Sequence, residues 1–102
     1  MELNQYQYDA MKTRLNTANS FYAILNLAGE VGELHSLLAK EIRDGKLDQD
    51  LVKKELGDIL WCLAAVVGDF GFTLEEVAKA NLIKLAKRQK NNTITGSGDV
   101  RE

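Results

Sequence analysis

The sequence predicts an all-α fold, a four-helix-type bundle. Its 102 residues include no proline and only 7% are aromatic, a composition that suits helices better than a β-sandwich. Apolar residues recur at helical spacing along most of the chain. Turn and cap residues divide this pattern into four segments. A chain of this length is expected to form one domain with a modest core.

Local signals set the boundaries of the helices. Asn19 or Ser20 is a suitable N-cap for the second helix, and Gly45 ends it. Thr73 opens the fourth helix in the capping-box pattern Thr-x-x-Glu. The expected helices cover residues 3–16, 21–43, 48 or 50 to 70, and 73–90, so that the helical domain spans 1–90 and a flexible C-terminal tail spans 91–102.

Charge, cysteine usage and hydropathy limit the partners and the compartment. The formal net charge is −2 and the pI is about 5.4, which gives no general attraction to nucleic acid. The single cysteine, Cys62, cannot form an internal disulfide, which fits a reducing compartment. The longest apolar run, residues 59–67, is too short to span a bilayer. We therefore expect a cytoplasmic protein that binds neither nucleic acid nor membrane.

Two acidic motifs stand out. Residues 30–33 (Glu-Val-Gly-Glu) and 55–58 (Glu-Leu-Gly-Asp) each place two carboxylates three positions apart. Residues at this spacing project from the same side of a helix, so two such helices facing each other would bring four carboxylates together. Like charges repel unless a cation neutralises them. The sequence therefore predicts a divalent-metal site. Its expected ligands are Glu30, Glu33, Glu55 and Asp58.

A helical projection separates the two acids of each motif. At about 100° per residue, Glu30 and Glu55 lie in the middle of the apolar arcs of their helices. Glu33 and Asp58 lie about 60° to one side, at the edge of these arcs. A neighbouring lysine or arginine could satisfy one buried glutamate, but the repeated pattern favours a metal. Carboxylate oxygens favour Mg²⁺, or Mn²⁺ as a substitute, over Zn²⁺, and sparsely ligated Mg²⁺ commonly binds phosphate.

Several segments combine into a specific pattern that covers most of the chain. They are Gly-Glu-Val-Gly-Glu-Leu (29–34), Lys-Glu-Leu-Gly-Asp-Ile-Leu-Trp (54–61), a later helix with Asn81, Lys84 and Arg88, and Gly-Ser-Gly-Asp-x-Arg (96–101). This pattern resembles the MazG-like nucleotide pyrophosphohydrolases of the all-α NTP pyrophosphatase superfamily. The resemblance implies Mg²⁺-dependent hydrolysis of (deoxy)nucleoside triphosphates to the monophosphate and pyrophosphate, with a role in house-cleaning of the nucleotide pool. It also implies a homodimer or homotetramer.

The resemblance implies a role for the site residues. The four acids would bind the metal, and Asn81, Lys84 and Arg88 would hold the phosphates. The spacing of these three residues agrees, because i, i+3 and i+7 form one stripe on a helix, although a solvated basic face has the same spacing. A metal-polarised water would be the nucleophile, with Glu30 or Glu33 as the general base.

The base pocket and the subunit interface are less defined. Trp61 could stack on a nucleobase or anchor an interface, and Phe21 and Tyr22 could line the base site or fill the core. Apolar residues all round the third helix predict that part of it is buried against another copy. The tail motif could close over the phosphates or be disordered. Nothing in the sequence selects one base.

Three alternatives compete with this interpretation. A ferritin-like di-iron protein needs Glu-x-x-His pairs, but Ser36 and Trp61 stand where those histidines would be. A non-catalytic helical binding or regulatory module would be recognised by an incomplete set of acids and cations, and this set is complete. A phosphoribosyl-ATP-type pyrophosphohydrolase belongs to the same superfamily, and the sequence leaves this alternative open.

Overall fold

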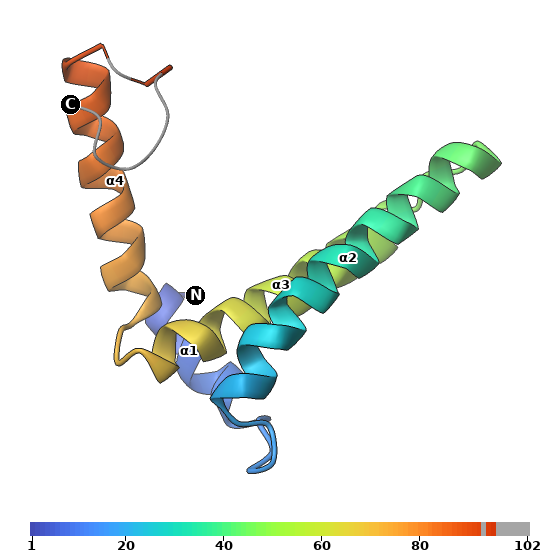
Figure 1. Ribbon diagram of the computed structural model, residues 1–102, viewed down its shortest axis with the longest axis horizontal. Helices are drawn as coiled ribbons and strands as arrows, with labels where there is room; N and C mark the ends of the chain where they lie inside the picture. Colours follow the sequence, from blue (N-terminus) through green and yellow to red (C-terminus); the bar gives the residue numbers. More distant parts are fainter. Residues whose placement is uncertain (93, 96–102) are drawn as a thin grey trace.

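The computed structural model describes residues 1–92, 94 and 95. Its helices are α1 (Leu3–Met11), α2 (Ser20–Asp44), α3 (Gln49–Asp69) and α4 (Leu74–Lys90). No strand occurs in this part of the chain, so the predicted all-α class with four helices is confirmed (Figure 1). The predicted tail includes residue 93 and residues 96–102, which lie outside the described residues, and the extent of the domain stays a prediction.

Side-chain N-caps accept hydrogen bonds from first-turn amides at the start of three helices. Asn19 accepts a hydrogen bond from the amide three residues on (3.0 Å), and Asp48 accepts from the amides two and three residues on (3.0 and 3.3 Å). Thr73 and Glu76 form both halves of the predicted capping box. Each cap satisfies an amide that has no partner inside its own helix. Gly45 ends α2 in a left-handed conformation with φ of 70°.

The prediction for the first helix was wrong at its C-terminal end, because α1 stops at Met11 rather than at residue 16. The hydroxyl of Thr13 donates to the carbonyl of Ala10 at 2.7 Å. Arg14 binds the end of α3 instead, where its guanidinium donates to both carboxylate oxygens of Asp69 at 2.9 and 3.0 Å. These contacts outweigh the weak helical spacing that continues after Met11.

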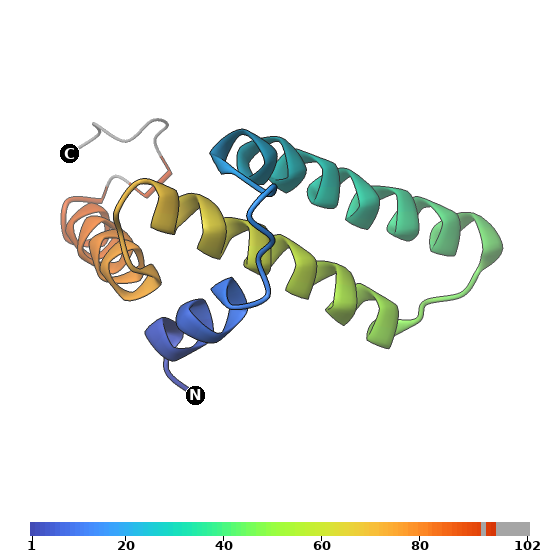
Figure 2. The same ribbon diagram turned by 90° about the horizontal axis from the view of Figure 1, so that it is seen from below.

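α2 and α3 lie side by side as an antiparallel hairpin, and α1 crosses near the end of α3 (Figure 1, Figure 2). A small cluster joins α1, α3 and α4: Tyr6 and Met11 pack against the buried residues Ala64, Val67 and Leu74. α4 leaves the end of α3 at an angle of 94°. Among the described residues it contacts α1 and α3 but not α2.

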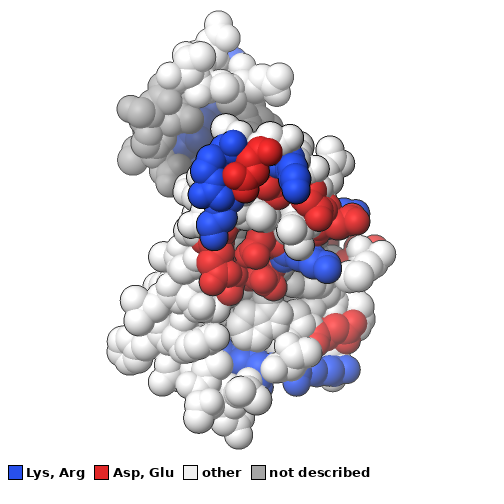
Figure 3. Space-filling model, turned by 90° about the vertical axis from the view of Figure 1, so that its right-hand side faces the viewer, with Lys and Arg blue, Asp and Glu red and all other residues white. Residues whose placement is uncertain are grey.

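Much apolar surface is left exposed. The large apolar side chains that are at least 50% exposed include Phe21, Ile24, Leu25, Phe70, Leu82 and Ile83. The radius of gyration is 16.5 Å, whereas a compact chain of about 100 residues has about 13 Å. The surface at the outer end of the α2–α3 hairpin is charged instead, with acidic and basic side chains interleaved (Figure 3). In the described part of the chain, no single helix has the length and apolar composition of a membrane span. The pair α3 and α4 meets these criteria only when the two helices are taken together across their bend.

Candidate metal centre

The α2–α3 hairpin brings the two acidic motifs face to face. One carboxylate oxygen from each of Glu30, Glu55 and Asp58 lies within 4.8 Å of the other two. Glu33 lies outside this group of three, but its charge and a hydrogen bond both act on Glu30. We call Glu30, Glu33, Glu55 and Asp58 the acid cluster. Its members come from two adjacent helices, as the spacing of the motifs predicted.

Burial differs within the acid cluster as the helical projection indicated. Glu30 and Glu55 are half-buried, whereas Glu33 and Asp58 are exposed. The Oε2 atoms of Glu30 and Glu55 are buried and have no hydrogen-bond partner among the described residues. A buried polar atom left in this way costs about 1–3 kcal/mol, and more when it is charged. Two such oxygens beside two further carboxylates are therefore suited to a cation.

The environment raises the pKa of Glu30 above its ordinary value of 4.5. Burial is the largest cause, followed by the charges of Glu33, Asp58 and Glu55 and by the hydrogen bond to Glu33. None of the ion pairs between described residues includes a member of the acid cluster. A lysine or arginine partner, the alternative to a metal, is thus not found within the described residues.

The chemistry of the donors fits a hard divalent ion. All four side chains of the acid cluster offer carboxylate oxygens, which Mg²⁺ and Mn²⁺ prefer. No helix fills the space beside Gly32 and Gly57, since a Cβ atom at either position would meet nothing within 4 Å among the described residues. No other backbone of the described chain approaches these glycines closely, so space for a ligand or a second copy remains.

Three side chains next to the acid cluster were not predicted as neighbours of the metal site from the sequence. Asn26 donates from Nδ2 to the sulfur of Cys62 at 3.3 Å, which links α2 to α3 about one turn from the acids. Burial raises the pKa of Cys62; the Asn26 bond lowers it, and the charges of Glu30 and Asp58 raise it further. Cys62 is 1% exposed and therefore belongs to the buried interior. Helical spacing from Glu30 could have identified Asn26.

Tyr6 is the third of these side chains, and it brings α1 to the site. Burial raises the pKa of its phenol, and the charges of Asp58 and then Cys62 raise it further. Its helical spacing in the sequence indicated only that it belongs to the packed face of α1.

The structure does not bring the predicted phosphate-binding residues to the acid cluster. Asn81 is exposed and Lys84 half-buried, and both line a cavity of about 450 Å³ together with Phe72. Arg88, one turn further on, is only 5% exposed and does not line this cavity. All three lie on α4, which does not contact α2 within the described residues. One chain therefore presents the acids and these residues on separate arms.

The three aromatic residues predicted for a base pocket do not all line the same cavity. Tyr22 and Trp61 line one cavity of about 310 Å³, whereas Phe21 lines another of about 320 Å³ with Phe70. Trp61 donates from Nε1 to the carbonyl of Ala10 (3.1 Å) and to the hydroxyl of Thr13 (2.9 Å), so it also holds the end of α1. Phe21 and Tyr22 are 77% and 47% exposed, so the alternative that they fill the core is wrong.

Comparisons with known proteins place this geometry in context. A sequence profile described as the MazG nucleotide pyrophosphohydrolase domain matches residues 20–93. The Gene 37 protein of Mycobacterium phage L5 is 36% identical over 85 residues, an alignment that covers 78% of this chain and 75% of that protein. No solved structure matches the chain significantly. The segment that matches the profile contains α2, α3 and α4, and so the whole acid cluster, but not α1.

Proposed function

Because the chain belongs to the MazG nucleotide pyrophosphohydrolase family, we propose that it hydrolyses (deoxy)nucleoside triphosphates to the monophosphate and pyrophosphate with Mg²⁺. The acid cluster carries this proposal, since it holds two buried carboxylate oxygens without partners among the described residues. Mn²⁺ would be a substitute, because it prefers the same oxygen ligands. The expected setting is the cytoplasm, where the enzyme would remove unwanted nucleotides from the pool.

Each group of residues would have a distinct task. The acid cluster would hold the ion, which when bound would compensate phosphate charge and polarise a water. Glu30 or Glu33 would accept the proton of the attacking water. Asn81, Lys84 and Arg88 would bind phosphate oxygens and stabilise the charge that develops on the leaving pyrophosphate. Phosphoryl transfer asks a protein mainly for this kind of positioning and charge compensation.

The first experiment is a panel of standard and modified nucleotides, phosphoribosyl-ATP included, incubated with Mg²⁺, with Mn²⁺ and with a chelator. We expect release of pyrophosphate with either metal and none with the chelator. The preferred nucleotide would identify the base and the sugar. Absence of turnover for every nucleotide with both metals would favour a non-catalytic binding module instead.

The separation of the two arms implies a site shared between copies. Asp58 precedes the end of α3 by 11 residues and Lys84 follows the start of α4 by 10. At 1.5 Å per residue and nearly a right angle between the helices, roughly 20 Å separate these two positions. We therefore propose that α4 of a second copy supplies its cations to the acid cluster of the first.

The oligomeric state tests this arrangement. The exposed apolar side chains of α2 and α4 and the open shape of the chain predict a stable homodimer or homotetramer. Light scattering coupled to size exclusion at micromolar concentration should give a mass of two or four chains. A monomer that hydrolyses nucleotides at full rate would contradict the shared site.

The aromatic residues give a test of the base pocket. Tyr22 lines a cavity with Trp61, whereas its neighbour Phe21 lines a different one. Loss of base stacking is worth about 1–3 kcal/mol, so we expect Tyr22→Ala to raise KM about 10-fold. Phe21→Ala is the matched control, because it removes an exposed aromatic side chain from the adjacent position, and it should leave KM within about twofold. A KM of Tyr22→Ala within about twofold of the parent value would remove Tyr22 from the pocket.

A further inference from the structure

The start of α4 is held by two side chains of α1. The carboxamide oxygen of Gln7 accepts a hydrogen bond from the amide of Leu74 (2.9 Å), and that of Asn4 accepts from the amide of Glu75 (3.0 Å). These amides belong to the first turn of α4, where no partner exists within the helix. α1 thus completes the N-terminus of a helix that begins more than 60 residues later in the chain.

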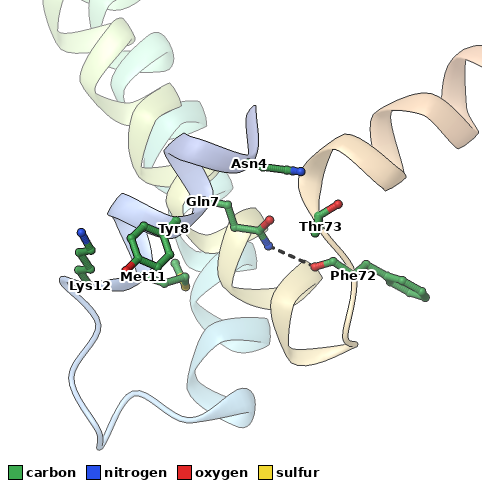
Figure 4. Close-up of a pocket in the computed structure, with 7 residues that line it drawn as sticks. All are labelled: Asn4, Gln7, Tyr8, Met11, Lys12, Phe72 and Thr73. Carbon is green, nitrogen blue, oxygen red and sulfur yellow. Dashed lines mark hydrogen bonds between the residues drawn. The ribbon is translucent and has the colours of Figure 1, made fainter. Parts of the chain in front are cut away.

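Gln7 also binds the other side of the bend. Its Nε2 donates to the carbonyl of Ala64 in α3 (3.2 Å) and to the carbonyl of Phe72 between α3 and α4 (3.3 Å). One half-buried carboxamide therefore contacts α3, the turn and α4 at once, and Figure 4 shows its bond to the turn. This carboxamide lies directly against Gly68, because a Cβ atom built at Gly68 would be in ordinary van der Waals contact with Nε2, at 3.5 Å.

Between the described residues, α4 contacts α1 and α3 near its first turn and makes no contact with α2. The apolar side chain that α4 buries is Leu74, its first residue, and its other buried residue among those described is Arg88. Beyond its first turn, α4 extends away from the α2–α3 hairpin (Figure 1). The polar contacts of Gln7 and Asn4 are therefore placed where they set the angle at this bend.

We propose that Gln7, supported by Asn4, is a positioning residue that fixes the angle between α3 and α4 and so determines where Asn81 and Lys84 meet the nucleotide. This inference rests on the proposed function for the role of α4. Lys84 lies 10 residues from the start of α4, which is about 15 Å along the helix. A change of ten degrees at the bend would move it by about 2–3 Å, and misplacement by about 1 Å can cost a hundredfold in rate.

Two variants of Gln7 separate its two sides. Gln7→Met keeps the length of the side chain but removes every hydrogen bond. Gln7→Glu keeps an acceptor for the amide of Leu74 but cannot donate to the carbonyls of Ala64 and Phe72 as a carboxylate. We expect kcat/KM to fall about 10- to 100-fold in Gln7→Met, with both kcat and KM affected. Gln7→Glu should show a smaller fall in kcat/KM, because it keeps the hydrogen bond from the amide of Leu74 but loses those to the carbonyls of Ala64 and Phe72.

A distance measurement reports the angle independently of activity. Spin labels at Lys53→Cys in α3 and Lys79→Cys in α4 would occupy exposed positions, while Cys62 is buried and keeps its thiol. Labelled chains are diluted with an excess of unlabelled chains so that distances within one copy dominate. We expect a narrow distance distribution for the parent protein and a broader or shifted one for Gln7→Met.

Arg14→Met is the matched control for stability. It removes the two hydrogen bonds to Asp69 that tie α1 to α3, but none of the contacts at the start of α4. We expect it to lower the Tm while leaving the distance distribution and kcat unchanged. If Gln7→Met lowers the Tm but leaves the distances and kcat as in Arg14→Met, the positioning role is overturned. If the parent protein hydrolyses no nucleotide, the proposed function fails, and the distances still decide whether Gln7 sets the angle.

Discussion

Replacing Glu30 by Gln is expected to stabilise the metal-free protein and to reduce the turnover measured with Mg²⁺. The change removes the half-buried charge that burial and the charges of Glu33, Asp58 and Glu55 disfavour. We expect the Tm of the metal-free protein to rise by a few degrees, by analogy with other strained functional sites. Loss of one group that stabilises transition-state charge commonly costs about 10²–10³ in kcat, so turnover with Mg²⁺ should fall by at least about 100-fold.

The pH dependence of stability follows from the same charge. The pKa of Glu30 is raised in the folded protein, so the folded state binds its proton more tightly than the unfolded chain does. The free energy of unfolding of the metal-free protein should therefore fall as the pH rises from the ordinary pKa of 4.5 through the raised pKa. Saturating Mg²⁺ should reverse this loss, because it binds the ionised acid cluster. Glu30→Gln should remove this component of the pH dependence.

Glu41→Gln is the matched control for these measurements. Glu41 is a buried glutamate of the same helix, and its Oε2 accepts a hydrogen bond from the amide of Asp48. It lies 11 residues from Glu30, about 16 Å along α2. This variant should retain Mg²⁺-dependent turnover. If Glu30→Gln were less stable than the parent protein and still active, the acid cluster would not be a metal site.

The second large effect is the recovery of activity from two inactive variants. Glu55→Gln lacks a member of the acid cluster, and Lys84→Met lacks a cation of α4, so each homo-oligomer should be nearly inactive. In an oligomer that contains both chains, one type of site combines an intact acid cluster with an intact α4. For dimers that assemble at random, roughly a quarter of all sites would be intact. Co-expression with two different tags, followed by purification and assay, measures this recovery.

A control separates recovery of the site from nonspecific effects of mixing. Lys79→Met removes a lysine of α4 that is outside the predicted set and pairs with Glu75 at 3.9 Å on the exposed surface. Lys79→Met alone should be active. A mixture of Lys79→Met with Glu55→Gln should show only the activity of those sites whose acid cluster comes from a Lys79→Met chain. Absence of recovery in the mixture of Glu55→Gln with Lys84→Met would mean that acids and cations act within one chain.

The features that depend on neighbouring residues in the sequence were predictable. The acid cluster follows from two i, i+3 pairs. Helical periodicity placed Glu30 and Glu55 in the middle of the apolar arcs, where the structure has them half-buried, and placed Asp58 at the edge, where it is exposed. The capping box at Thr73 is likewise encoded within four residues. These predictions succeeded because an α-helix converts short sequence spacing directly into a shared face.

The features that depend on distant contacts were not predictable. The early end of α1 follows from the binding of Arg14 to Asp69, 55 residues away. The direction of α4 depends on Gln7, whose partners Ala64 and Leu74 are 57 and 67 residues away. No periodicity encodes such pairs, so the spacing that placed Asn81, Lys84 and Arg88 on one helix gave no indication of their distance from the acids.

The identity of the products tests the central claim most directly. A nucleotide that the panel identifies as a substrate would be followed by ³¹P NMR in the presence of Mg²⁺, with the parent protein and with Glu55→Gln. The proposed function predicts that nucleoside monophosphate and pyrophosphate appear in equal amounts with the parent protein and not with the variant. Formation of nucleoside diphosphate and inorganic phosphate, or equal rates for both proteins, would contradict it.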